Sequence, residues 1–132
     1  MKEENDYSMF ITTCAGRDAA KEIAKLLVEK RLAACVQMFP VESVYVWQKE
    51  VCDESETALF IKSKSVLFDK IVAAIREIHK YEVPEIIQIP IIGGLPEYLK
   101  WIDERTEGDG TGKSKTPLPP DPVRGNGVII PH

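Results

Sequence analysis

Apolar and polar side chains follow two different periods in the first third of the chain. Over residues 7–13 they alternate one by one, which predicts a strand with two distinct faces. From Cys14 onwards the period changes, and apolar positions recur at three- and four-residue spacing through residues 17–31. This repeat predicts an amphipathic helix, and Asp18 lies at the end where a negative charge interacts favourably with the helix dipole.

The middle of the chain has the pattern of two strands joined by a turn. Residues 34–47 alternate over much of their length, but Pro40 lacks a backbone donor and predicts a bulge or an unpaired stretch there. We expect the turn within residues 49–55. Residues 56–62 then form the next strand, with apolar side chains on both faces.

A second helix, a strand and a short third helix follow. Residues 65–78 carry an apolar stripe at helical spacing, and Ser65 is placed to cap this helix. Residues 85–92 are rich in isoleucine, which predicts a strand buried on both faces. After a Gly93-Gly94 turn, Pro96 fits the first position of the last helix.

The predicted order is therefore β-α-β-β-α-β followed by a short C-terminal helix. This is the ferredoxin-like α+β arrangement, an antiparallel four-stranded sheet with two helices on one face. The other sheet face stays open, and we expect Phe10, Phe60 and several isoleucines on it. A monomer would expose these side chains as a large apolar patch, so the pattern predicts an oligomer.

Composition and charge narrow the class of protein. The chain has 132 residues and a formal net charge of −4, and a nucleic-acid partner would favour a basic surplus instead. We expect no membrane partner, because the chain has no apolar run near 18 residues and its polar, acidic start does not resemble a signal peptide. The three cysteines have no close spacing, which favours reduced thiols in the cytoplasm.

A Gly- and Pro-rich segment follows the predicted domain. Residues 107–132 hold five of the 8 glycines and five of the 9 prolines, and such a segment cannot build a core of its own. We therefore place the domain at residues 6–106 and a C-terminal tail at 107–132. The apolar residues 128–130 predict that the tail docks on a sheet edge or on a neighbouring subunit.

Five short segments go beyond periodicity, and together they closely resemble the CutA family of divalent-cation tolerance proteins. The segments are EKRLAACV (29–36), SVYVW (43–47), HKYEVPEII (79–87), TTC (12–14) and YLKWI (98–102). The resemblance covers nearly the whole predicted domain. It implies a ferredoxin-like fold, a homotrimer built by pairing sheet edges, and a cytosolic protein of metal tolerance that binds copper(II).

Three residues are candidate ligands for copper(II) or another divalent cation. Thiolate and imidazole suit copper or zinc, and a carboxylate would complete a mixed site of Cys14, His79 and Glu85. Of these, only His79 matches a ligand position of the family. Each also has a structural interpretation: His79 as a cation at a helix C-terminus, Cys14 as a small buried hydrophobe, and Glu85 as a solvated or paired carboxylate.

The alternative is a regulatory trimer that resembles the PII signalling proteins and binds a small ligand between subunits. Aromatic side chains would form the wall of such a cleft, and a basic side chain would add a polar contact. The candidate cleft residues are Arg17, Tyr45, Trp47, Lys62, Tyr81 and Trp101. The aromatic residues would equally suit a subunit interface, where such side chains are enriched.

Catalysis is not expected from this sequence. Gly16-Arg17 opens the first helix, and helix N-termini offer amides to anions, but this pair alone is a weak sign of phosphatase chemistry. The chain has 2 histidines and shows no Ser-His-Asp set, no Cys-His pair with an orienting group, no phosphate-binding loop and no dinucleotide fingerprint. We therefore predict a binding protein that is not an enzyme and needs no organic cofactor.

Overall fold

The computed structural model describes residues 6–108, and its helices and strands follow the predicted order. They are β1 (Tyr7–Cys14), α1 (Arg17–Glu29), β2 (Cys35–Trp47), β3 (Glu50–Lys64), a 3-10 turn (Ser65–Leu67), α2 (Phe68–Ile78), β4 (Ile86–Pro90) and α3 (Pro96–Arg105).

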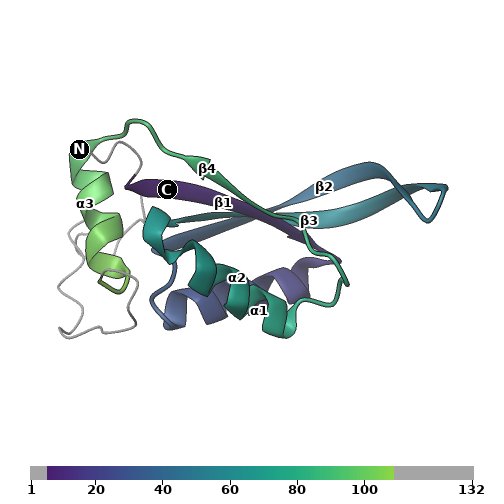
Figure 1. Ribbon diagram of the computed structural model, residues 1–132, viewed down its shortest axis with the longest axis horizontal. Coiled ribbons are helices and arrows are strands. Elements are labelled where there is room, and N and C mark those ends of the chain that lie inside the picture. The colour runs from purple at the N-terminus through teal and green to yellow at the C-terminus, as the bar shows by residue number, and fades with distance from the viewer. Residues whose placement is uncertain (1–5, 109–132) are drawn as a thin grey trace.

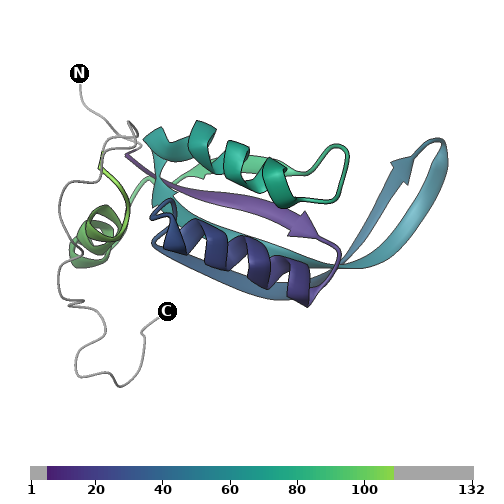
Figure 2. The ribbon, with the colours of Figure 1, turned by 90° about the horizontal axis from the view of Figure 1, so that it is seen from below.

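The four strands form one antiparallel sheet in the order β2-β3-β1-β4. Figures 1 and 2 show α1 and α2 side by side on one face of this sheet and α3 at one of its ends. This is the ferredoxin-like α+β fold, and the predicted fold class is confirmed.

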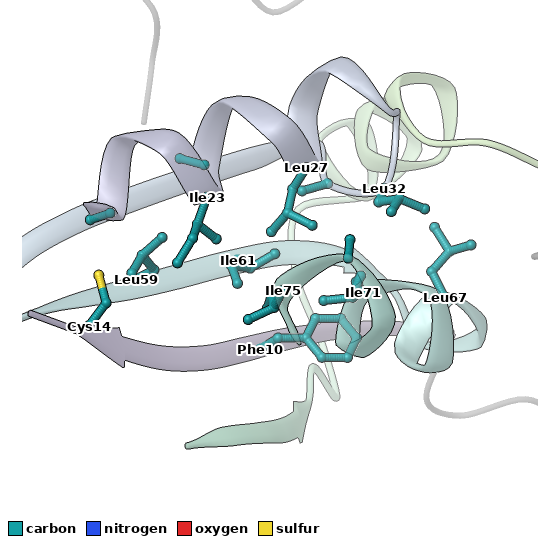
Figure 3. Packing of buried hydrophobic residues seen from close by; sticks show 14 residues of the cluster. Phe10, Cys14, Ile23, Leu27, Leu32, Leu59, Ile61, Leu67, Ile71 and Ile75 are labelled. Atoms are coloured by element: carbon teal, nitrogen blue, oxygen red, sulfur yellow. The ribbon is translucent and has the colours of Figure 1, made fainter. Parts of the chain in front are cut away.

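The hydrophobic core lies between the sheet and the two helices that cover it. Ile23 and Leu27 of α1 meet Ile61 of β3, and Ile71 and Ile75 of α2 close the same cluster (Figure 3). These side chains are almost wholly excluded from solvent. Burial of each such side chain stabilises the fold by about 1.5–3 kcal/mol before the entropy cost of ordering it.

Phe10 belongs to this core, and its predicted place on the open sheet face was wrong. It is fully buried, and its ring stacks on Phe68 with centroids 6.0 Å apart. Its strand partner is Ile61, on the face that the helices cover. Phe60 does lie on the open face, edge-on to Phe39 at 4.7 Å. Alternation separates two faces of a strand, but it does not say which face the helices will cover.

β2 and β3 form a hairpin that extends well beyond the helices (Figure 1). Trp47 pairs with Glu50, so the turn consists of Gln48 and Lys49, whose φ angles are 53° and 70°. The predicted turn at 49–55 was therefore wrong. The polar residues after Lys49 continue the strand, because this part of the hairpin is exposed and has no need of apolar side chains.

Both edge strands differ from their predicted form. Pro40 pairs with Thr57 in an unbroken register and makes no bulge, because β2 is an edge strand and its proline can face away from the ladder. β4 is the opposite edge. Ile87 and Ile89 of β4 are exposed, so the prediction of a strand buried on both faces was wrong. Two helices cover only one face of a four-stranded sheet, which leaves these side chains unpacked in a single chain.

The predicted Ser65 cap is also absent from the helix that follows β3. A 3-10 turn precedes α2, and no side chain caps either of these two segments. The Ser65 hydroxyl instead lies 2.6 Å from the hydroxyl of Ser8, so it joins the turn to β1. The hydrogen bond between Ser65 and Ser8 thus takes the place of the predicted helix cap.

The segment after α3 is tied to the body of the domain by polar contacts. The guanidinium of Arg31 donates to the carbonyl oxygens of Glu104 and Thr106, and the Glu107 amide donates to the Arg31 carbonyl. The Lys70 ammonium lies 3.0 Å from the Glu107 carboxylate. We call residues 104–108 with these contacts the C-terminal clasp.

The predicted tail lies outside the described residues, apart from its first two positions. The proposed docking of residues 128–130 therefore stays a prediction. Among the helices of residues 6–108, none has the length and apolar character needed to cross a membrane.

Candidate functional site

A groove of about 720 Å³ lies beside the outer half of the β2–β3 hairpin. Its volume falls within the range of small-molecule sites in proteins, about 300–1,000 Å³. Strands β2 and β3 form one wall, and the loop between α2 and β4 forms the other. The lining residues are Thr13, Ser43, Val44, Tyr45, Trp47, Glu54, Glu56, Tyr81, Glu82, Val83 and Glu85.

Two tyrosine–glutamate pairs define the polar part of the groove. The Tyr45 hydroxyl donates to Glu54 Oε1 at 2.7 Å, and the Tyr81 hydroxyl donates to Glu56 Oε2 at 2.6 Å. The bond to Glu54 raises the pKa of Tyr45 to about 12, with smaller contributions from burial and nearby negative charge. Burial first, and then the bond to Glu56, raises the pKa of Tyr81. Both phenols are therefore neutral donors near pH 7.

The hairpin register places three of these four groups. Tyr45 faces Cys52 across the ladder, and Glu54 and Glu56 follow at two-residue spacing on the same side of β3. Side chains two residues apart on a strand share a face, so both carboxylates point the way Tyr45 does. The fourth group, Tyr81, comes from the loop after α2.

His79 holds Tyr81 in place. The Tyr81 amide donates to His79 Nδ1 at 3.1 Å, and the two rings meet edge to face at 4.8 Å. Because Nδ1 accepts this hydrogen bond, the imidazole proton is assigned to Nε2, which donates to the Thr13 carbonyl oxygen at 2.7 Å. Both ring nitrogens are thus engaged within the chain, and His79 joins the end of α2 to the end of β1.

The predicted metal ligands do not converge. Cys14 and His79 line a separate hollow of about 400 Å³, whereas Glu85 is exposed in the groove. Burial raises the pKa of the Cys14 thiol, with a further contribution from the charge of Glu56, and the thiol donates to the Gly16 carbonyl oxygen. Within residues 6–108, no three His, Cys, Asp or Glu side chains are grouped to hold a metal ion. As placed in one chain, these three residues do not fit a metal site.

The predicted cleft residues fall into two groups. Tyr45, Trp47 and Tyr81 share the groove. Arg17, Lys62 and Trp101 do not line it. Arg17 is exposed at the start of α1, and Lys62 donates to Gln37 Oε1 at 2.8 Å and lies 5.8 Å from the Tyr98 ring. Trp101 is buried in a second apolar cluster with Cys35 and Ile102.

The carboxylates that line the groove and that the sequence analysis did not single out are Glu54, Glu56 and Glu82. A signal for the first two was present, since carboxylates at two-residue spacing lie on one face of a strand. The misplaced turn hid it, because Glu54 was assigned to a loop. Glu82 gave no signal, because only the path of the α2–β4 loop brings it to the hairpin.

Comparison with known proteins identifies one family. A family model described as CutA1 divalent ion tolerance protein matches residues 8–105. A protein of Thermus thermophilus named divalent-cation tolerance protein CutA is 42% identical over 97 residues, which are 73% of this chain and 94% of that protein. The mouse protein named CutA is 41% identical over 113 residues, which are 85% of this chain and 63% of that protein.

A solved structure agrees with these sequence matches. The structure titled periplasmic divalent cation tolerance protein CutA from Archaeoglobus fulgidus superposes with a TM-score of 0.75 at 38% identity, covering 76% of this chain and 99% of that one. Against several vertebrate relatives the coverage is smaller. The chain spans 63%, 66% and 56% of the mouse, zebrafish and human proteins.

Proposed function

The chain belongs to the CutA1 divalent ion tolerance protein family, and we propose that it acts in divalent-cation tolerance as a cytoplasmic homotrimer. Proteins of this family are not generally characterised as enzymes, and we propose a binding role here. The observation that supports the trimer most directly is the face of the sheet that α1 and α2 leave uncovered.

This open face carries apolar side chains from several strands. Ile87 and Ile89 of β4 are 46% and 39% exposed, and Phe39 of β2 is exposed beside Phe60. Exposed apolar surface of this extent marks an interface. The sheet also ends in two different edges, β2 and β4. Pairing β2 of one copy with β4 of the next is a heterologous contact, which a ring of three copies can close.

Sedimentation of the full chain tests the trimer. We expect a mass three times the chain mass of 14.8 kDa at micromolar concentration. Phe60→Asp and Ile87→Asp should dissociate it, because each would bury an unpaired charge in the interface. Ile87 is exposed in a single chain, so that variant should keep its circular dichroism spectrum. Val66→Asp, at an exposed apolar position in the 3-10 turn, is the matched control. A wild-type mass near one chain would contradict the proposal.

Divalent-cation binding through His79 is part of the proposal and has its own test. Of the other two predicted ligands, only Cys14 lines the same hollow as His79, so a shared site would involve these two residues and not Glu85. A metal would have to replace one of the two hydrogen bonds of the imidazole, so we expect weak binding of copper(II). Calorimetric titration without reducing agent should show lower copper affinity for His79→Ala than for wild type. Equal affinities would exclude His79 as a ligand.

Cytoplasmic location is also proposed. The three cysteines are free thiols, which suits a reducing compartment. Fractionation of cells that produce the chain tests this, and recovery in another compartment would contradict it.

A second candidate function is binding of a small ligand in the groove. The observation that favours it is that Tyr45, Trp47 and Tyr81 line one cavity of suitable volume. Fluorescence of Trp47 should report a bound ligand, and Trp47→Leu should abolish that signal while leaving the other tryptophan in place.

A further inference from the structure

A proline-rich segment of the C-terminal tail has no part in the functions proposed above. Residues 117–124 read PLPPDPVR, with prolines at four of the eight positions. They contain two overlapping Pro-x-x-Pro sequences, at 117–120 and 119–122, and Arg124 stands two positions after the second. Sequences of this kind are typical ligands of aromatic-lined grooves on other proteins.

The charge at one end of the segment gives it a direction. Aromatic-lined grooves bind polyproline II helices, which have three residues per turn, so two prolines three positions apart lie on one side of such a helix. Pro119 and Pro122 have this spacing, and Arg124 follows them. A guanidinium group pairs strongly and in a fixed orientation with a carboxylate. The expected partner surface therefore has two aromatic pockets and an acidic side chain beside one end of the groove.

The proline content also lowers the entropy cost of binding. A proline ring fixes its own φ at about −65°, and the residue before a proline is kept out of the helical region. Every position of residues 117–124 except Val123 and Arg124 is a proline or precedes one. A segment restricted in this way has fewer conformations to lose when a partner binds it.

The segment lies outside the part of the chain that matches the family. The family model covers residues 8–105 and ends before the first proline of the segment. Of the 9 prolines of the chain, five lie in residues 107–132, and four of those five are in this segment. Neither the shared fold nor cation tolerance accounts for this concentration of proline beside a basic residue.

The C-terminal clasp holds the start of the tail beside the two helices. Glu107 is buried against Lys70 of α2, and its amide donates to the carbonyl oxygen of Arg31, which follows α1. Both helices lie on one face of the sheet, opposite the open face that the proposed trimer would bury (Figure 2). Residues 109–116 can span about 30 Å when extended, at about 3.3–3.6 Å per residue. The segment can therefore reach a partner without entering the trimer interface.

We propose that residues 117–124 bind a partner protein whose surface carries an aromatic-lined groove of the SH3 type, with Pro119 and Pro122 in its pockets and Arg124 against an acidic side chain. This role goes beyond divalent-cation tolerance and does not depend on the cavity beside the hairpin. In a trimer three tails would be presented together, so a partner with several such grooves would bind more tightly than a partner with one.

Calorimetric titration tests the proposal, with the full chain titrated against a panel of purified SH3 domains that accept the order Pro-x-x-Pro-x-Arg. We expect saturable binding to at least one of them, and a synthetic peptide of residues 115–126 should compete for it. Pro122→Ala and Arg124→Ala should each weaken binding by about tenfold or more, because each removes one anchor. Arg124→Lys should lose less affinity, since it keeps the positive charge.

Two substitutions in the tail are matched controls. Pro131→Ala removes a proline outside the segment, and Lys115→Ala removes a cation that precedes it, so both should leave the affinity unchanged. Absence of binding to every domain of the panel would overturn the proposal. Equal affinities of the wild type, Pro122→Ala and Arg124→Ala would also overturn it, because the contact would then lie elsewhere on the chain. A loss with Lys115→Ala as large as with Arg124→Ala would show a general charge effect instead.

Discussion

At the scale of single residues, Arg31 links the end of α1 to the C-terminal clasp. Its backbone is left-handed, with φ of 60°, and this conformation ends the helix. Glycine is the usual residue at such a position because it has no Cβ. The guanidinium contacts to Glu104 and Thr106 explain why an arginine stands there instead.

Two substitutions separate these roles of Arg31. Arg31→Ala should lower the free energy of unfolding by about 2–3 kcal/mol, because it loses the charged hydrogen bonds and keeps the strained backbone. Arg31→Gly should cost about 1 kcal/mol less, because glycine relieves the strain. Urea unfolding of both variants measures the difference. Equal losses would show that the backbone conformation carries no strain.

Tyrosine ionisation gives a prediction for alkaline pH. The chain has 4 tyrosines, and the pKa of each is raised in the fold. Burial, followed by the hydrogen bond to Asp103, raises the pKa of Tyr7 to about 12. Burial also raises the pKa of Tyr98 to about 12. The unfolded chain loses these protons near pH 10, so it binds fewer protons than the fold above that pH.

The stability contributed by the protonated phenols should thus be complete below pH 10 and fall as pH rises from 10 to about 12. Phenolate absorbance should appear later in the native protein than in urea. Tyr45→Phe removes one exposed phenol and should leave most of this effect. Native titration at the ordinary value near 10 would contradict the prediction.

At the scale of elements, the β2–β3 hairpin contains a turn whose backbone conformation is unfavourable for the residues that form it. A two-residue hairpin loop with positive φ at both positions favours Asn-Gly, and this chain has Gln48-Lys49. The hairpin forms because 13 residues of β2 pair continuously with β3. The hydrogen-bonded pairing of β2 with β3 therefore holds Gln48 and Lys49 in the turn, and the turn itself contributes little to the stability of the hairpin.

Replacing Gln48-Lys49 with an Asn-Gly pair should therefore stabilise the chain. We expect a gain of about 1 kcal/mol in the free energy of unfolding, because glycine adopts positive φ without steric cost. Thermal unfolding of the Gln48→Asn, Lys49→Gly double variant measures it. Lys49→Ala is the comparison, since alanine keeps a Cβ at that position. A loss of stability in the double variant would contradict the assigned turn.

At the scale of the whole molecule, the C-terminal clasp ties the residues after α3 to the body of the domain. Glu107 is buried, and its carbonyl oxygen accepts from the Lys64 ammonium while its carboxylate pairs with Lys70. Lys64 also donates to the Gly108 carbonyl oxygen. Sequence composition placed the boundary between residues 106 and 107. We propose from these contacts that the domain extends through Gly108.

Two truncations test that boundary. A chain that ends after Gly108 should retain the unfolding free energy of the full chain. A chain that ends after Arg105 loses the contacts of Thr106, Glu107 and Gly108, and we expect it to lose about 3 kcal/mol, at roughly 1 kcal/mol for each of several hydrogen bonds. Urea unfolding of both distinguishes them. Equal stabilities would show that the clasp contributes nothing.

The sequence alone determined the fold class, because hydrophobic period is a local property. Alternation near Phe10 and helical spacing near Ile23 identify a strand and a helix without any knowledge of their neighbours. The order of elements then restricted the topology to the ferredoxin-like arrangement, and five short segments indicated the family. The same alternation brought Tyr45 and Trp47 to one face of one strand.

Tertiary structure decided what depends on residues distant in sequence. Phe10 is buried because the helices pack against the sheet face that carries it. Alternation along the strand cannot specify which of the two faces the helices cover. The turn lies at Gln48 and Lys49 because pairing with β2 extends β3 through polar residues. Glu56 became part of a groove, and His79 became a part-buried hydrogen-bond link to Thr13, only when the α2–β4 loop folded against the hairpin. Long-range packing and hydrogen bonding fixed those positions, and neither leaves a local pattern in the sequence.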